Sequence, residues 1–211
     1  MLENLPGAVG HVLRHQRAGL DQIVFHQTPL RPGMAALEVG SLAFADHAPI
    51  PARYTADGEG LSPPLHWRGV PASAASVLLI VEDADAPTPH PLVHAIVVDL
   101  ACDACALAEG ALDSPDHDGT GVHSGRHSLL GSGWLPPDPP PGHGTHRYAF
   151  QVFALAAGDP FSDKPGREEV LNALASRALA SGCLIGTYAR PDGSQPADAP
   201  APAVGGQVAP Q

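Results

Sequence analysis

Short apolar runs bounded by proline, glycine or aspartate restrict the fold of this chain more than any other feature. The clearest runs are residues 76–81, 93–100 and 147–156. The 211 residues include 24 prolines and 23 glycines, which favour turns and loops between short elements. Short strands separated by turn residues are typical of an antiparallel sheet or a β-sandwich. We therefore predict a mostly β protein with many loops.

Shorter apolar runs extend this pattern along most of the chain. Residues 37–39, 42–44 and 65–67 alternate or run apolar, and residues 184–189 are predicted to be the last strand. Aromatic residues make up only 5% of the chain, so valine, leucine and alanine must fill most of the core. Together the runs predict a single β domain over residues 37–190, a size that one hydrophobic core can support.

Three segments lack the strand pattern. Residues 1–36 precede the β domain and are predicted to be a helical arm. Residues 191–211 form a Pro/Ala/Gly-rich tail that buries too little apolar surface to become ordered. Within the domain, residues 103–145 hold few apolar runs and are predicted to be a long loop, of the kind that is either functional or disordered.

Helical periodicity occurs twice. Apolar residues recur at helical spacing over residues 3–25, where three glycines interrupt them, and over residues 166–184. The first helix lies in the arm, which is predicted either to pack on its own domain or to form a homodimer through residues 1–36. Its polar face is only weakly basic, which argues against membrane binding.

Charge and composition exclude several classes of function. Eleven Lys and Arg against 22 Asp and Glu give a net charge of −11, and no basic cluster is present to bind nucleic acid. No apolar run approaches the ~20 residues of a membrane span, and the first residues hold no signal-peptide pattern. Three cysteines are too few for a disulfide scaffold. We therefore expect a cytoplasmic protein without a nucleic-acid partner or stable membrane insertion.

A cluster of polar side chains falls where the predicted strands begin and end, as ligand sites often do. Asp83 and Asp85 follow the first long run and, being two residues apart, point to the same side of an extended segment. Pro87 ends that strand. His94 opens the second run and His146 the third. Histidine donors suit phosphate or sulfate oxyanions, so these residues predict a small anion pocket.

Each of these residues also has a structural interpretation, which the sequence leaves open. Aspartate caps turn amides well, and we expect this role for at least one carboxylate, Asp85 in particular. A histidine at the start of an apolar strand is often a half-buried structural residue, which applies to His94 and His146. Arg147 is expected to point away from the pocket and to form a salt bridge or a hydrogen bond, because neighbours on a strand face opposite sides.

A proline- and glycine-rich loop over residues 133–145 directly precedes His146. Such a segment is stiff and brings backbone close to a ligand, so we assign it to the pocket wall, with Tyr148 close by. The alternative is a surface loop of the polyproline type.

A metal or redox site has less support. Cys102 and Cys105 form a Cys-x-x-Cys without a second ligand pair, so free thiols are the better interpretation. Four histidines of the long loop match no tight metal-ligand spacing and are predicted to be solvated: His117, His123, His127 and His143.

Several motifs occur in a fixed order along the chain. Asp83-Ala-Asp-Ala-Pro87 is followed by a histidine that enters a valine-rich strand, and then by a Pro/Gly loop that ends in His146-Arg-Tyr148. Three further stretches support the pattern: residues 53–67, 125–128 and 186–190. In these motifs the chain resembles the phosphatidylethanolamine-binding protein (PEBP) family, and its bacterial Raf kinase inhibitor-like branch most of all. The resemblance covers residues 38–190.

The resemblance implies a β-sandwich of two antiparallel-rich sheets, with small flanking helices and an anion pocket at one end. It implies neither a cofactor nor a metal. The family binds phosphate groups, phospholipid head groups or phosphorylated peptides. Transferred by motif, the ligand-binding residues are Asp83, Asp85, Pro87, His94, Gly133, Trp134, Pro137, His146 and Tyr148.

Two positions depart from the family pattern. Ala84 stands where the family usually has proline, which should lower rigidity only. Pro136 lies in the loop that is usually Gly-Tyr-x-Gly-Pro in the family, and it removes a backbone N–H that could bind an anion. The size or the affinity of the ligand is therefore expected to differ from that of the family.

We predict a binding protein for a phosphate-type small anion or a phosphorylated ligand, and we assign no catalytic residue. In this hypothesis His94 and His146 donate to the phosphoryl group, and Asp83 fixes their tautomers and orientation. Two alternatives stay open. One is an enzyme that uses the same Asp/His pocket for acid–base or hydrolytic chemistry on a small metabolite. The other is a protein-interaction regulator whose pocket is vestigial.

Overall fold

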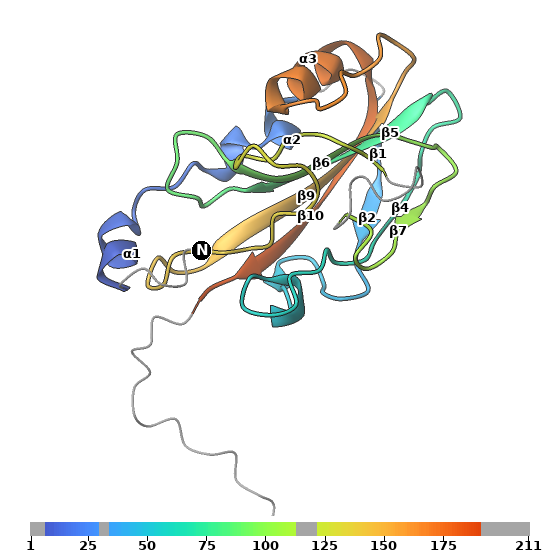
Figure 1. Ribbon diagram of the computed structural model, residues 1–211. Coiled ribbons are helices and arrows are strands. Elements are labelled where there is room, and N and C mark those ends of the chain that lie inside the picture. The colour runs from blue at the N-terminus through green and yellow to red at the C-terminus, as the bar shows by residue number, and fades with distance from the viewer. Residues whose placement is uncertain (1–6, 30–33, 113–121, 191–211) are drawn as a thin grey trace, which may run out of the picture.

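The computed structural model describes residues 7–29, 34–112 and 122–190 (Figure 1). In chain order the elements are α1 (Gly7–Leu13), the 3-10 helix η1 (Leu20–Gln22), α2 (Val24–Gln27), β1 (Ala35–Ala36), β2 (Glu38–Gly40), β3 (Ala48–Pro49), the 3-10 helix η2 (Ala52–Tyr54), β4 (Leu65–Arg68), β5 (Ser76–Asp83), β6 (Leu92–Leu100), β7 (Ala106–Leu107), β8 (His123–Ser124), β9 (His146–Leu155), α3 (Arg167–Arg177) and β10 (Ala178–Tyr188). Strands therefore dominate, as the apolar runs predict.

A seven-stranded sheet forms the centre of the molecule. Its strand order is β1-β10-β9-β5-β6-β8, and β3 also pairs with β10. The four long strands β10, β9, β5 and β6 are antiparallel to their neighbours, whereas β1 and β3 are parallel to β10. All eight residues of β5 are buried, which is typical of a strand that is covered on both faces.

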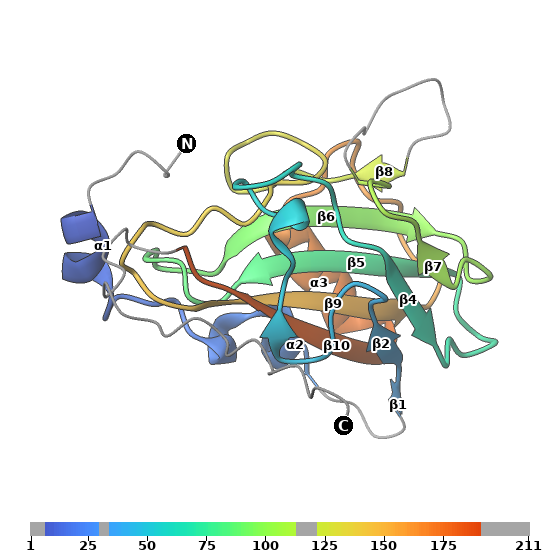
Figure 2. The same ribbon diagram turned by 90° about the horizontal axis from the view of Figure 1, so that it is seen from below.

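A second sheet of three strands, in the order β2-β4-β7, covers one face of the large sheet (Figure 2). Leu65 and Trp67 of β4 share a hydrophobic core with Val77, Leu79 and Val81 of β5. These three residues of β5 are two apart in sequence, so they point to the same face of the strand.

The opposite face of the large sheet is covered by helices. Leu78 and Ile80, which alternate with the residues that face the small sheet, share a second core with Val170 and Leu174 of α3. Val24 of α2 belongs to the same core. The molecule is thus the predicted mostly β fold with two sheets and small flanking helices.

The prediction of one helix over residues 166–184 is wrong in its second half. The helix α3 ends at Arg177, and the chain continues directly into the strand β10. Burial along the start of β10 alternates, with Ala180, Gly182 and Leu184 buried and the residues between them half-buried. Small and apolar residues at this spacing satisfy the strand period as well as the helix period, and pairing with β9 selects the strand.

The prediction of one helix over residues 3–25 is also wrong. Within the described part of the arm, α1 ends at Leu13 and the chain stays irregular until η1. Gly19 has a φ of 101°, which is outside the helical region and is easily adopted by glycine alone. Its amide donates to the carbonyl of Ala84 at 2.7 Å, so this segment bonds to the loop after β5. The residues before Gly7 lie outside the described part.

The described arm packs on its own domain. The amide of Val24 donates to the Glu82 carboxylate at 2.7 Å, and the amide of Phe25 donates to the Gln151 side chain at 2.6 Å. Glu82 and Gln151 lie on the central strands β5 and β9 and are fully buried. Of the two alternatives for the arm, residues 7–29 therefore show the first, while a homodimer through residues 1–36 stays a prediction.

Residues 42–44 and the predicted long loop over residues 103–145 differ from their predicted structure. Residues 42–44 do not form a strand; Phe44 instead reaches the core from a loop and packs on Phe150, with 5.5 Å between ring centroids. The predicted long loop contains the short strands β7 and β8, and its residues 113–121 lie outside the described residues, as does the predicted tail 191–211. Among the described residues, no helix is long and apolar enough to span a bilayer.

Candidate functional site

A cavity of about 150 Å³ opens where β5 ends and where β6 and β9 begin. We call it the His94 cavity. Four of the predicted site residues line it: Asp83, Pro87, His94 and His146. Antiparallel pairing of β5 with both β6 and β9 brings these residues together from three segments of the chain. The cavity also contains Leu135 and Pro136 of the predicted wall loop.

Asp83 is the organising carboxylate of this cavity. Its Oδ1 accepts the amide of Asp85 at 2.8 Å, and its Oδ2 accepts Nδ1–H of His146 at 2.7 Å. The turn-capping role that we expected of Asp85 thus belongs to Asp83, because the chain turns directly after this residue. The predicted role in orienting a histidine holds for His146.

His146 does not present a free nitrogen to the cavity. Its Nδ1 is bound to Asp83, and its Nε2 lies 2.6 Å from Nδ1 of His143. His143 is 1% exposed and its Nε2 donates to the carbonyl of Leu13 in the arm at 2.9 Å. The prediction that His143 is a solvated loop residue is therefore wrong. The expectation that His146 donates to a ligand is also not met by this geometry.

One positive charge follows from this chain of hydrogen bonds. Carbonyl and carboxylate oxygens only accept, so Nε2 of His143 and Nδ1 of His146 both carry hydrogen. The short contact between the two rings needs one further proton, so the pair is cationic. Burial and the neighbouring charge of His146 lower the pKa of His143. The positive charge of the pair thus lies next to the carboxylate of Asp83, which accepts Nδ1–H of His146.

His94 differs from His146, because one of its two ring nitrogens has no hydrogen-bond partner among the described residues. Its Nδ1 donates to the carbonyl of Leu135 at 2.6 Å, and the side chain is 3% exposed. Its Nε2 is buried and has no hydrogen-bond partner among the described residues. Burial lowers the pKa of His94, although the carboxylate of Asp83 acts in the other direction. His94 is therefore neutral, with a bare lone pair on Nε2, and its tautomer is fixed by Leu135 and not by Asp83.

We expect this neutral histidine to make the fold less stable in mild acid. Below about pH 6.5 the imidazole of the unfolded chain gains a proton that folded His94 does not bind, so the free energy of unfolding falls as the pH falls. Urea denaturation at about pH 7.5 and pH 5 measures this slope. In His94→Asn, which keeps a donor for Leu135 but does not titrate, the slope should be smaller. An equal slope in this variant would contradict the assignment.

Apart from Asp85, four predicted site residues do not line the cavity: Gly133, Trp134, Pro137 and Tyr148. The ring of His94 meets Tyr148 edge-on at 5.2 Å and Trp134 at 6.2 Å. Burial raises the pKa of Tyr148 well above its usual range, so the phenol stays neutral. Gly133 and Pro137 also do not line the cavity, although their neighbours Leu135 and Pro136 do. These residues support His94 and shape the loop.

Asp85 is turned away from the cavity. Its carboxylate accepts the amide of Arg147 at 2.9 Å and the Nε of the same residue at 2.7 Å. Arg17 of the arm reaches it at 3.0 Å. The expected salt bridge of Arg147 is confirmed, and it connects β9 to the loop after β5. Asp85 is thus a structural ion-pair partner in this geometry.

Several residues that line the His94 cavity were not predicted from the sequence, above all Asp138. Its Oδ1 accepts Nη1–H of Arg190 at 2.7 Å, and Arg190 also donates to the carbonyl of Pro139. Pro139 and Pro140 lie in the Pro/Gly segment, which was the available signal, but Arg190 lies 52 residues after Asp138 in the sequence. Leu92 and Leu129 complete the apolar part of the wall.

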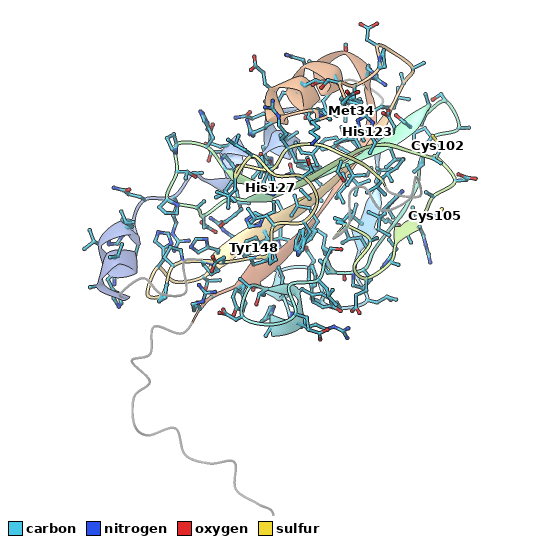
Figure 3. All side chains as sticks on the ribbon, viewed as in Figure 1. Met34, Cys102, Cys105, His123, His127 and Tyr148 are labelled. Carbon is cyan, nitrogen blue, oxygen red and sulfur yellow. The ribbon has the colours of Figure 1, made fainter. Side chains whose placement is uncertain are left out.

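The cysteines lie far from the cavity. Cys102 and Cys105 are free and occupy the turn after β6, at the end of the molecule that lies opposite α1 (Figure 3). Tyr148, which packs on His94, lies towards the other end in the same view. Within the described ranges, no group of three or more His, Cys, Asp or Glu side chains could hold a metal ion. The prediction that His117 is a solvated loop residue falls on a residue outside these ranges.

Comparison with known proteins identifies this architecture. A family model described as "Phosphatidylethanolamine-binding protein" matches residues 40–189. A protein of Methanothermobacter thermautotrophicus named UPF0098 protein is 38% identical over 151 residues, which cover 70% of this chain and 95% of the relative. A protein of the same name from Aquifex aeolicus is 36% identical over 160 residues, which cover 75% and 91%.

Two solved structures share the fold. A PEBP homologue from Chlamydia trachomatis superposes with a TM-score of 0.65 at 33% identity, covering 74% of this chain and 98% of its own. YbcL of E. coli, described as a new member of the mammalian PEBP family, gives a TM-score of 0.67 at 26% identity, covering 74% and 99%. The arm residues 7–29 precede the matched segment. The chain belongs to the phosphatidylethanolamine-binding protein family.

Proposed function

We propose that this protein binds a small phosphate-type anion, free or as part of a phosphorylated ligand, in the His94 cavity. The observation that carries the proposal is Nε2 of His94, a buried polar atom without a partner among the described residues in the wall of a small cavity. A buried polar atom that lacks a hydrogen bond is destabilising, so it marks a place where a ligand is favourable. Catalysis forms no part of the proposal.

The size of the cavity supports a head group and not a whole lipid. At about 30 Å³ for each water molecule of the liquid, 150 Å³ holds only a few such volumes. Leu92, Leu129 and Pro87 supply an apolar rim for the remainder of a larger ligand. A phosphoryl group with a short substituent fits this description.

The charges around the cavity do not oppose a single negative charge. The Asp83 carboxylate lies 2.7 Å from Nδ1 of His146 in the cationic histidine pair, and the Asp138 carboxylate pairs at 2.7 Å with Arg190, which also pairs with Asp57. Each carboxylate of the lining thus has a positive partner close by, which lowers the repulsion that an anion would meet. The overall charge of −11 therefore does not by itself prevent an anion from binding in this cavity.

Thermal unfolding with added inorganic phosphate tests the proposal. At a hundredfold excess over the dissociation constant, binding should stabilise the folded protein by ~2.7 kcal/mol. Exchange of both His94 and His146 for alanine should remove this shift, and His94→Ala alone should reduce it strongly. His26→Ala, an exposed histidine on α2, is the matched control and should keep it. A phosphate-induced shift that survives in the double variant would refute the proposed site.

We propose the cytoplasm as the compartment. The three cysteines among the described residues are free, as expected in a reducing environment. Cell fractionation with an antibody against the protein tests this, and recovery in a membrane or extracellular fraction would contradict it.

A further inference from the structure

The wall of the His94 cavity accepts hydrogen bonds more readily than it donates them. His94 uses its only proton on the carbonyl of Leu135, so Nε2 can only accept. The carboxylate of Asp138 is a second acceptor in the lining. A fully deprotonated oxyanion also offers only acceptors, and two lone pairs that face each other repel.

Few groups in the lining of the His94 cavity can donate a hydrogen bond. Pro87, Pro136, Pro139 and Pro140 line the cavity, and proline has no backbone N–H. The amide of Leu135 is spent on the carbonyl of His94 at 2.9 Å. Few groups of the lining therefore remain to donate to a ligand.

The other polar side chains that line the cavity already have partners. Both nitrogens of His146 are engaged, one by Asp83 and one by His143. Both oxygens of Asp83 accept hydrogen bonds. The Tyr148 hydroxyl and Nε1 of Trp134 have no hydrogen-bond partner among the described residues, but both residues pack on the ring of His94 and neither lines the cavity. The remaining titratable group that acts on His94 is His127 of the loop before β9; burial lowers the pKa of His127, which favours its neutral form.

We propose that the cavity selects a phosphoryl group that retains one proton, and that this P–O–H group donates to Nε2 of His94. This inference rests on the proposed function and specifies the chemical form of its ligand. Phosphate monoesters and hydrogen phosphates exist in such a form near neutral pH, because their second pKa is about 6 or above. Sulfate and sulfate esters have no proton to donate in this range, so they are excluded despite their similar shape.

Methyl phosphate and methyl sulfate form a matched pair of probes. At about pH 5.5 both carry a single negative charge and have nearly the same shape, and they differ by one hydroxyl proton. Isothermal titration calorimetry should show methyl phosphate binding at least tenfold more tightly than methyl sulfate. Above about pH 6, methyl phosphate loses its proton and its affinity should fall, approaching tenfold per pH unit.

Two substitutions at His94 test the donor directly. The amide nitrogen of glutamine can occupy the position of Nε2 and donate, so His94→Gln should bind methyl sulfate at least as well as methyl phosphate. The amide nitrogen of asparagine occupies the position of Nδ1, so His94→Asn keeps the bond to Leu135 but presents nothing to the ligand. In that variant the preference for methyl phosphate should fall below twofold. His26→Ala should leave the preference unchanged.

The outcomes separate this inference from the proposed function. If neither probe binds the native protein at any pH, the phosphate-type ligand itself is refuted. If both bind equally well and without pH dependence, the function stands and the selected proton is refuted. A preference of tenfold or more that is retained in His94→Asn would also overturn the inference, because the discriminating group would then lie elsewhere.

Discussion

Replacement of Glu82 by alanine is expected to lower the free energy of unfolding by about 3–5 kcal/mol, the range for breaking a buried ion pair. Glu82 is fully buried in the central strand β5. Its carboxylate accepts Nε–H of Arg167 at 2.6 Å, the Gln151 side chain at 2.8 Å and the amide of Val24 at 2.7 Å. Alanine would leave all three donors without their acceptor.

The effect should be large because Glu82 joins three separate elements of the fold. Arg167 begins α3, Val24 begins α2 in the arm, and Gln151 lies on β9. Urea denaturation followed by the fluorescence of Trp67 and Trp134 measures the loss. Hydrogen exchange should show faster exchange in α2 than in the wild-type protein.

An exposed glutamate provides the control for this experiment. Glu59 pairs with Arg53 at 3.2 Å, and its side chain is 62% exposed. Glu59→Ala should change the free energy of unfolding by no more than about 0.5 kcal/mol. A loss below about 1 kcal/mol in Glu82→Ala would contradict the assigned role, because removal of one buried hydrogen-bonding partner alone should exceed it.

Replacement of Asp85 by alanine is expected to destabilise the fold by about 3 kcal/mol, at the lower end of the same range. The side chain of Asp85 is 1% exposed, whereas those of Arg147 and Arg17 are 37% and 30% exposed. Both arginines can therefore regain some water when the carboxylate is removed. The arm should also loosen, since Arg17 loses its ion pair.

The same residue should give the fold a distinct sensitivity to acid. Burial by itself would raise the pKa of Asp85, but hydrogen bonds and charge from Arg147 and Arg17 lower it below its usual value. A depressed carboxyl pKa contributes stability that is fully present above the unfolded value near 3.9 and is lost as the pH falls through the folded value. Below about pH 4, the wild-type protein should therefore lose more stability than Asp85→Ala does.

Equilibrium denaturation from about pH 6 to pH 2 measures this difference. The exposed Asp163→Ala variant should follow the wild-type curve over the whole range. If Asp85→Ala and the wild-type protein lose stability in parallel below pH 4, the ion pair does not stabilise the native state in the way that its geometry indicates.

The position of the candidate site was predictable because the strands around it have strong local patterns. β5, β6 and β9 are continuous apolar runs, so Asp83, His94 and His146 had to lie at their ends. Antiparallel pairing of such runs then brings these ends together. The strand β10 was not predictable, because its first residues satisfy both the helix and the strand period, and only pairing with β9 selects between them.

The burial of His143 could not be predicted from the local sequence pattern. A histidine between two glycines in a proline-rich loop has the sequence features of a solvated residue. Its burial depends on Leu13, which is 130 residues away in the chain, and on His146. Asp138 is a similar case, since its partner Arg190 lies 52 residues further on. No short-range signal contains the contact of His143 with Leu13 or that of Asp138 with Arg190.

The sequence by itself determined the mostly β fold, the PEBP family and the chemical groups that meet at one end of the large sheet. The fold and the position of these groups follow from residue types and short-range periodicity, and the family follows from the resemblance of its ordered motifs. Only the tertiary structure decided what those groups can do. The proton on each histidine is placed by its hydrogen-bond partners, which are the Leu135 carbonyl for His94 and Asp83 with His143 for His146. Two histidines that are equal as donors in the sequence thus become one neutral acceptor and one structural residue with both nitrogens engaged.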